Sequence, residues 1–381
     1  MRLTDQQQRA VWYWLPGIIA GMLSWVAFVT LGQTSVIRAT GLALVIVGMA
    51  MTLRRSGTVL ATIGGLALAL SPAFWSQTGG QDSLSLPVTT VVLLVIGLLT
   101  VLVTRFSQRW FLSLIIGFAA FAILFWSQLA SVGSLRLTTL SSAWLLYLLI
   151  DALYITNPRP DDPSMDTLKP RHTIGMLVLL AVGVINTPLF VLLAPAVAIG
   201  LILTHVRLGW WYWLLFALII VFGMYGVATE YISSTWWQYP AAQAQVQGIR
   251  VPYMMADGWR EASRWIELVD LVVGQFTVVG VVLGIMGLAR LSRWYPPLGT
   301  VAMIAYATHA LFGLVYFGKN SAVLLLPLFM IQVFWMTYAI YALGEWLQRS
   351  ANPPNHMLRW LAPAVYVWLP VVMLARIIGV I

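Results

Sequence analysis

The sequence predicts an all-α, polytopic integral membrane protein, built as a bundle of about 13 membrane-spanning helices. Three observations predict this class. First, the chain of 381 residues is 60% hydrophobic and 9% charged, whereas a soluble domain carries about 25% charged residues. Second, apolar runs of helical length follow one another along the chain. Third, only residues 230–270 form a long polar interval, so we expect residues 1–381 to be a single transmembrane domain.

The expected spans follow from the length that a helix needs to cross a bilayer. A spanning helix requires about 20 mostly apolar residues. On this criterion the spans are residues 12–31, 36–53, 58–75, 88–104, 110–127, 138–156, 172–186, 188–205, 210–229, 268–289, 298–316, 322–347 and 359–378.

Two parts of this series need their own interpretation. Arg2 and Arg9 precede the first apolar run as in a signal peptide, but the run is long enough to span and lacks a clear cleavage site, so we predict an uncleaved helix. The spans 172–186 and 188–205 are separated only by Thr187. The sequence at 186–188, Asn-Thr-Pro, is either a tight turn at the surface or a break inside one re-entrant unit.

The distribution of basic residues predicts the orientation. With the N-terminus in the cytoplasm, 14 of the 21 Lys and Arg residues fall on the cytoplasmic side and 7 on the outer side. This bias agrees with the excess of positive charge that cytoplasmic loops carry. The orientation places residues 230–270 outside the cytoplasm.

The polar interval 230–270 is the predicted outer docking surface. It contains five of the chain's 12 acidic residues, namely Glu230, Asp257, Glu261, Glu267 and Asp270. Within it, apolar residues recur at helical spacing between charged ones over about residues 256–268. This pattern is typical of an amphipathic helix that lies at the membrane interface.

Composition and spacing exclude several kinds of site. There are no cysteines, which excludes disulfides, thiolate nucleophiles and iron–sulfur clusters. The four histidines lie in four separate segments without metal-ligand spacing, so we expect no metal and no cofactor other than a bound lipid or polyprenyl phosphate. The net charge of +9 is spread over short loops, so we expect no nucleic-acid partner.

Ionisable residues inside spans are the candidate functional residues, since burying charge in a membrane is costly. Glu345 precedes Arg349 by four residues, which predicts a helical ion pair. Arg38 lies just inside the second span; its side chain either extends to the headgroups or holds a lipid phosphate. Arg260 and Arg264 are further candidates for binding a lipid phosphate.

Two carboxylates and a pair of relay groups complete the candidates. Glu267 and Asp270 are three residues apart and share one helix face. They either belong to an interfacial ladder of ion pairs with the preceding arginines or face a cavity as a carboxylate pair. Asp151 and His309 lie within apolar spans; each is either satisfied by its neighbours or takes part in a proton relay.

Four stretches resemble a known family. Residues 70–77 (LSPAFWSQ), 184–195 (VINTPLFVLLAP), 275–288 (QFTVVGVVLGIMGL) and 316–327 (YFGKNSAVLLLP) are, in this order, similar to bacterial members of the GT-C superfamily. These are polytopic glycosyltransferases that use polyprenyl-phosphate sugars. The resemblance covers roughly residues 60–345 and rests on short apolar motifs. It implies a bacterial cytoplasmic membrane as the location.

The chain departs from this family where the chemistry would occur. The resemblance implies a catalytic acid on a long first outer loop, whereas residues 32–36 form a short turn without an acid. Asp82 is the only acid in the loop that follows residues 74–77. Asn186 and Asn320 stand where the family would have a His and an Asp. General-base catalysis needs a group that accepts a proton, which an amide does not.

Three functions follow from these observations. The first is a non-catalytic membrane subunit on a GT-C-like scaffold, with a structural or lipid-binding role beside other membrane subunits. The alternative is an active polyprenyl-phosphate-sugar glycosyltransferase whose base is Asp82, Glu230, Glu267 or Asp270. The second alternative is an ion- or proton-conducting subunit of an energy-transducing complex with Asp151 and His309 as relay groups.

Overall fold

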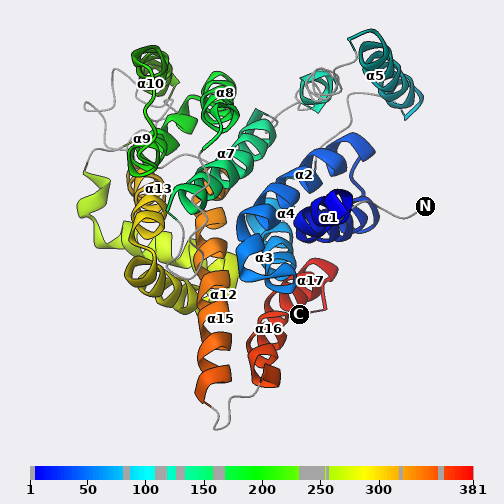
Figure 1. Cartoon of the computed structure of the whole chain (residues 1–381). Coiled ribbons are helices and arrows are strands. Elements are labelled where there is room, and N and C mark those ends of the chain that lie inside the picture. The colour runs from blue at the N-terminus through cyan, green and yellow to red at the C-terminus, as the bar shows by residue number, and fades with distance from the viewer. Residues whose placement is uncertain are drawn as a thin grey trace, which may run out of the picture.

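The computed structural model describes residues 5–79, 86–107, 117, 119–125, 134–157, 168–230, 254, 257–316, 321–350 and 356–380. These residues form helices apart from connections and one isolated bridge between Met254 and Tyr316. The helices are α1 (Asp5–Thr30), α2 (Val36–Leu53), α3 (Thr58–Ala69), α4 (Pro72–Trp75), α5 (Leu86–Ser107), α7 (Ser134–Thr156), α8 (Pro170–Asn186), α9 (Ala194–Leu203), α10 (Trp210–Glu230), α12 (Ala262–Trp294), α13 (Pro296–Val315), α14 (Ser321–Leu324), α15 (Leu326–Ser350), α16 (Leu361–Tyr366) and α17 (Trp368–Ile378) (Figure 1).

The predicted all-α membrane class is confirmed. Among the described residues, eight helices are long and apolar enough to cross a membrane. Three shorter apolar helices accompany them, at Thr58–Ala69, His172–Asn186 and Pro188–Leu203. The predicted number of 13 spans stays a prediction, because most of the expected span 110–127 lies outside the described residues.

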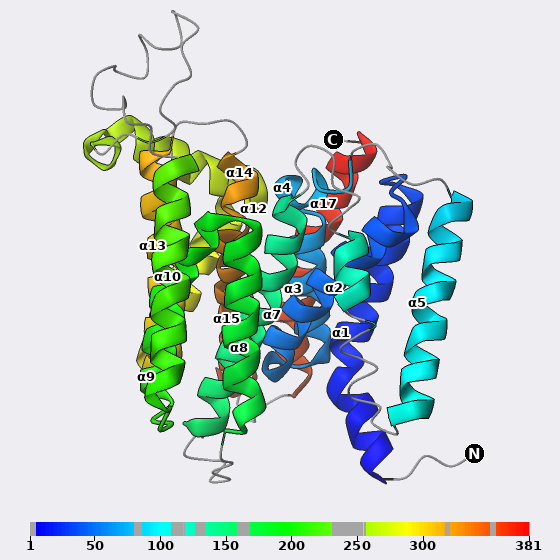
Figure 2. The ribbon, with the colours of Figure 1, turned by 90° about the horizontal axis from the view of Figure 1, so that it is seen from above.

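The helices run between two ends of the bundle. Following the predicted orientation, we call the end at which α1 begins and α2 ends the inner end, and the opposite end the outer end. Helix α17 ends at the outer end, opposite the start of α1 (Figure 2). An odd number of crossings gives this arrangement.

The expected span 58–75 is two helices instead of one. Helix α3 ends at Ala69 and α4 begins at Pro72, with Ser71 in an extended conformation between them. Proline lacks a backbone N–H and disfavours a helical residue before it, which explains the break. The 12 residues of α3 are about 18 Å long. This is shorter than the hydrocarbon core, so α3 and α4 together cover that depth.

In the turn at residues 186–188, Thr187 is buried, and Asn186 and Pro188 are half-buried. Thr187 is 4% exposed, and its hydroxyl lies 2.9 Å from that of Thr138 on α7. From this turn the chain returns toward the inner end through a 3₁₀ helix, η2 (Pro188–Leu193), and α9. The bundle covers Thr187, whereas the neighbouring Ile185 is 72% exposed, so both interpretations of residues 186–188 stay predictions.

The sequence predicts an interfacial helix at about residues 256–268 and a span at 268–289. The structure has a single element here, α12, with different bounds. It begins at Ala262, and Thr277 interrupts it with a φ of 63° and a ψ of 171°. Arg264 binds the outer end of α13, and the side-chain oxygen of Gln275 accepts a hydrogen bond from the N–H of Ala73, at 2.7 Å. Arg264 and Gln275 are about 16 Å apart along a helix. The first part of α12 therefore lies across the outer end of the bundle, and the chain turns inward at Thr277.

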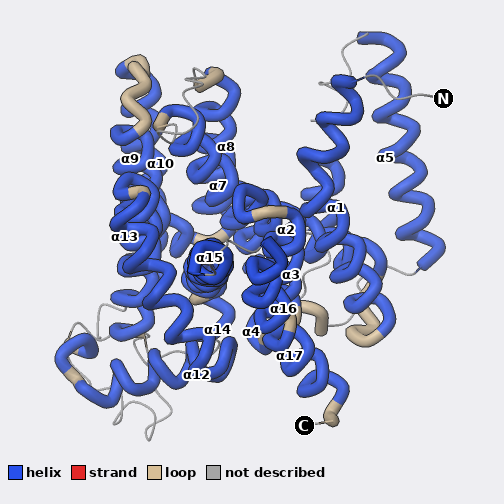
Figure 3. The backbone as a smooth tube through the Cα atoms, turned by 60° about the horizontal axis from the view of Figure 1, so that its bottom comes forward, coloured by secondary structure: helices blue, strands red, loops and turns tan. Residues whose placement is uncertain are grey.

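The second part of α12 packs closely against α15. A Cβ at Gly287 would lie 1.9 Å from the carbonyl oxygen of Trp335, and one at Gly284 would lie 2.1 Å from the side-chain nitrogen of Gln332. Such glycines let two helix backbones approach, as is common between membrane helices. Helix α15 also contacts α2, α3, α7, α13 and α16 and is the central helix of the bundle (Figure 3).

Candidate functional site

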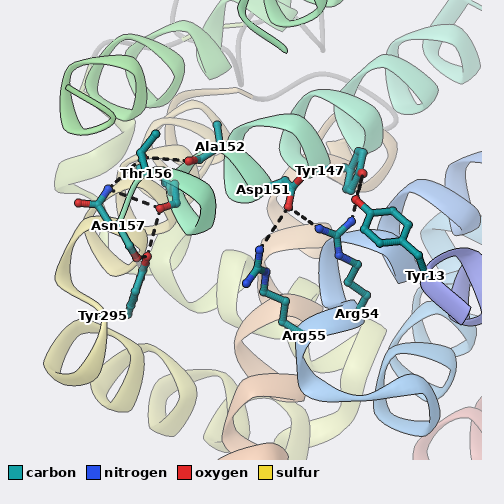
Figure 4. Close-up of polar contacts among 10 residues, drawn as sticks. Tyr13, Arg54, Arg55, Tyr147, Asp151, Ala152, Thr156, Asn157 and Tyr295 are labelled. Atoms are coloured by element: carbon teal, nitrogen blue, oxygen red, sulfur yellow. Dashed lines mark hydrogen bonds and ion pairs between the residues drawn. The ribbon is translucent and has the colours of Figure 1, made fainter. Parts of the chain in front are cut away.

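A polar cluster lies near the inner end, between α1, α2 and α7. We call it the inner arginine cluster; it consists of Tyr13, Arg54, Arg55, Tyr147 and Asp151 (Figure 4). The carboxylate oxygen Oδ1 of Asp151 lies 2.5 Å from Nη2 of Arg54 and 3.7 Å from Nη2 of Arg55. Arg54 also donates to the hydroxyl of Tyr147 at 3.1 Å, and this hydroxyl lies 2.9 Å from that of Tyr13.

Local structure brings the two arginines to this position. They form the 3₁₀ turn Arg54–Ser56 directly after α2, where a cation interacts favourably with the helix C-terminus. Gly57 ends the turn with a φ of 101°, a conformation in which glycine avoids the strain of a side chain. The guanidinium carbon of Arg54 lies 3.9 Å from the ring centre of Tyr13. That of Arg55 lies 4.5 Å from the ring centre of Tyr154.

Charge and burial give the inner arginine cluster a structural role. Asp151 is 6% exposed, and the side chains of Arg54 and Arg55 are 13% and 39% exposed. Two guanidinium groups and one carboxylate leave a net charge of about +1. The space between these residues has no volume that a water molecule could enter. The cluster therefore joins three helices and leaves no room for a ligand.

His309 lies in a separate polar region nearer the outer end. It is 2% exposed, and its Nδ1 lies 2.8 Å from the carbonyl oxygen of Ala305. That contact assigns the proton to Nδ1, so Nε2 is the acceptor. His309, Thr138 and Thr187 help to line a cavity of about 20 Å³, which is large enough for a water molecule.

An apolar layer separates His309 from Asp151. The described residues between the two regions surround a narrow space lined mainly by aliphatic and aromatic side chains, including Leu146, Val301 and Met330. Its one hydroxyl, that of Thr52, donates to the carbonyl oxygen of Gly48. The structure thus does not bring the two predicted relay groups together.

The guanidinium group of Arg264 binds the outer end of α13. Its Nε donates to the carbonyl oxygen of Leu314 at 3.2 Å, and its Nη2 donates to that of Gly313 at 2.9 Å and to that of Tyr316. The last carbonyl groups of a helix lack partners within it, and a cation is well suited to them. Arg264 also forms an ion pair with Glu267, as the spacing suggested.

The remaining acidic candidates on α12 are exposed. The side chain of Glu267 is 62% exposed, and Asp270 is exposed one turn further along the same helix. Neither residue lines the cavities beside His309 or Asp151. Arg260 is 67% exposed, lies 3.8 Å from Asp257 and stacks on Trp259. This group is therefore on the solvent- or headgroup-facing surface of the outer end.

Arg38 is buried at the outer end of α2. It is 2% exposed, and its Nη1 lies 3.3 Å from the carbonyl oxygens of both Thr78 and Gly79. The chain continues from Gly79 to Asp82, which lies outside the described residues. Glu230 is the last residue of α10, and the structure does not describe its side chain either.

Sequence reasoning identified local pairs and missed distant ones. The predicted ion pair between Glu345 and Arg349 is confirmed at 3.2 Å. Arg54 was not singled out, although two consecutive arginines after an apolar run were a visible signal. Its partner, Asp151, is 97 residues away, which spacing does not reveal. No group of three His, Asp or Glu residues suited to a metal ion occurs in the described part of the chain.

The chain matches no protein-family model, no curated protein and no solved structure. The resemblance to the GT-C superfamily therefore stays a prediction, carried by the four stretches quoted above.

Proposed function

We propose that the chain is a non-catalytic, multi-pass subunit of a larger membrane complex, built on a GT-C-like scaffold. Its role there is structural or lipid-binding. In support, Asp151 and Glu345 are held by ion pairs within the chain, and His309 by a backbone carbonyl. Such internal contacts stabilise a bundle. The space beside Asp151 holds no water-sized volume and the cavity beside His309 is about 20 Å³, both far below the size of a small-ligand pocket.

The main observation behind this proposal is the exposed apolar surface of helix α5. Among the described residues it is set apart from the rest of the bundle (Figure 2). Its apolar side chains are exposed on more than one face, and Leu94, Leu98 and Val101 are 67%, 61% and 64% exposed. A Cβ at Gly97 would have no neighbour within 4 Å. Membrane helices associate by close packing, so α5 offers a surface for a helix of another subunit.

Purification in a mild detergent, with mass spectrometry of the intact assembly, tests the proposal. We expect stoichiometric partner chains. We also expect Gly97→Trp on α5 to reduce their yield at least several-fold, because it changes the surface of α5. Ile285→Trp is the matched control, because Ile285 is 65% exposed on α12. A monomer that turns over a polyprenyl-phosphate sugar would refute the proposal.

One contact favours the second candidate, an active lipid-linked-sugar glycosyltransferase. The bonds from Arg38 to the carbonyl oxygens of Thr78 and Gly79 bring a cation beside the segment that leads to Asp82. A transferase of this class would need an acid beside an arginine that binds the lipid phosphate, and Arg38, which is 2% exposed, would have to release these carbonyl groups to bind one. If turnover is found, its loss in Asp82→Asn but not in Glu267→Gln would identify Asp82 as the base. The reverse result would identify Glu267.

A further inference from the structure

An apolar groove of about 480 Å³ lies between α8 and α10. Each helix lines it with one face, as the spacing of its residues requires. The lining residues are Leu177, Val178, Ala181, Val184 and Ile185 of α8, and Leu215, Leu218, Ile219 and Phe222 of α10. Val178, Leu218 and Phe222 are 53%, 57% and 57% exposed, so the groove is open along its length.

Contacts toward both ends of the groove set the distance between α8 and α10. Toward the outer end, Gly223 and Gly226 let α10 approach η2, and a Cβ at Gly226 would lie 2.6 Å from the ring of Pro188. At the inner end the hydroxyl of Tyr212 on α10 donates to the carbonyl oxygen of Thr173 on α8, at 3.0 Å. A helix with its side chains is about 10–12 Å wide, so it does not enter between two helices tied in this way. A flexible acyl chain does, and the volume lies within the range of about 300–1,000 Å³ for small-ligand sites.

The inner end of this groove is positively charged. Lys169 precedes α8 and Arg207 precedes α10, and both side chains are exposed. Residues 168–229 contain no Asp or Glu. Helices α8 and α10 also both begin here, which adds the positive ends of two helix dipoles.

Aromatic residues place this end at the level of the lipid headgroups. Trp210 and Trp211 stack with their ring centres 3.7 Å apart and are 63% and 61% exposed. Tryptophan is enriched where the hydrocarbon core meets the headgroups. An apolar groove that ends at basic residues at this depth matches the two parts of a phospholipid.

We infer that the α8–α10 groove binds one anionic phospholipid, with an acyl chain along the groove and its phosphate beside Lys169 and Arg207. The inference deepens the lipid-binding part of the proposed function and rests on it. Charge selects the anionic class, because the described residues from 168 to 229, which form both walls of the groove, include exposed cations and no Asp or Glu. The lipid would fill the gap between α10 and α8 over the middle of the membrane.

The full-length chain, reconstituted in vesicles of equal parts phosphatidylglycerol and phosphatidylcholine and then extracted in mild detergent, gives the test. Native mass spectrometry measures which lipid stays bound. We expect one phosphatidylglycerol per chain and a preference of at least tenfold over phosphatidylcholine. The double variant Lys169→Gln/Arg207→Gln is expected to lose this preference, and Ala181→Trp is expected to lose the lipid by filling the groove.

Matched controls separate these effects from general damage. Arg293→Gln removes an exposed cation at the inner end of α12, and Val282→Trp enlarges a side chain that is 50% exposed on the same helix. Both controls are expected to retain the lipid.

The inference fails if the wild-type chain retains no lipid, if it retains both lipids equally, or if the controls lose the lipid as the groove variants do. It also fails if a cross-linker on Leu218→Cys captures a helix of another subunit instead. In each of these cases stoichiometric partners would still support the proposed function. Transferase turnover would refute that function while leaving the lipid measurement intact.

Discussion

Asp151 on α7 accepts a hydrogen bond from Arg54, which follows α2, at 2.5 Å, although 97 residues separate the two in the chain. Asp151 is 6% exposed and the side chain of Arg54 is 13% exposed, whereas Arg55, the second cation near this carboxylate at 3.7 Å, is 39% exposed. The buried charge of Arg54 therefore depends mainly on Asp151. Removing one partner of a buried ion pair costs about 3–5 kcal/mol, whereas replacing both with apolar residues is often neutral.

Asp151→Leu is therefore expected to lower the free energy of unfolding by about 3–5 kcal/mol. The double variant Arg54→Met/Asp151→Leu is expected to recover most of that loss. Denaturant titration in detergent, followed by circular dichroism, measures both. Equal destabilisation of the single and the double variant would contradict the structural role of the pair. Arg349→Gln, at an exposed ion pair, is the control and is expected to change stability by less than about 1 kcal/mol.

Arg264→Met is expected to lower the free energy of unfolding by about 1–3 kcal/mol, because buried carbonyl groups at the end of α13 lose their donor. Arg260→Met is the matched control on the same segment, since its side chain is 67% exposed. It is expected to change stability by about 0.5 kcal/mol or less. If the two variants are equally stable, Arg264 does not cap α13.

Gly287→Ala is expected to destabilise the packing of α12 on α15, because the added Cβ would meet the carbonyl oxygen of Trp335 at 1.9 Å. Overpacking of this kind typically costs about 1–3 kcal/mol. Gly274→Ala adds the same methyl group on the same helix where nothing lies within 4 Å, and it is expected to be neutral or stabilising. Thermal unfolding in detergent compares the two, and a Gly287→Ala variant as stable as the control would contradict the close approach.

Thr277→Gly is expected to stabilise the protein. Thr277 adopts a φ of 63° and a ψ of 171°, a conformation almost confined to glycine, and such a residue costs about 1–3 kcal/mol. Thr277→Ala keeps the strain and is expected to remain close to the wild type. The same denaturant titration compares the two variants, and a glycine variant no more stable than the alanine variant would contradict the strained conformation of Thr277.

The absence of cysteine makes the orientation directly testable. Asp257→Cys lies at the outer end with a side chain that is 73% exposed, and Lys169→Cys lies exposed at the inner end. In intact cells a membrane-impermeant maleimide is expected to label the first variant and not the second. Labelling of Lys169→Cys alone would reverse the predicted topology.

The sequence predicted what depends on local pattern. Apolar runs predicted the helical class and most of the spans, and spacings of three and four residues predicted the ion pairs Arg264–Glu267 and Glu345–Arg349. The break at Thr277 was not predicted, because no proline or glycine occupies that position. Its cause is tertiary: Gln275 binds the start of α4, and the following turns of α12 pack on α15.

The candidate site was predicted less well than the fold. Asp151 and His309 were singled out correctly as buried ionisable residues, with 6% and 2% exposure. Whether they share a pathway depends on which side chains of α13 and α15 lie between them, and hydropathy does not give that register. The groove between α8 and α10 was missed for a related reason. Its existence depends on where glycines of α10 meet Pro188.

The hydrogen bond between Gln275 and Ala73 has a consequence for biogenesis. It joins residues 202 positions apart, so the outer end of the first four helices is completed only after α12 has been synthesised. At about 5–20 residues per second, translation of that interval takes about 10–40 s. During this time the short α3 and its extension α4 lie in the membrane without α15, which later packs against α3. Until the last third of the chain has been made, α3 can therefore pack only against the early helices, chiefly α1 and α2.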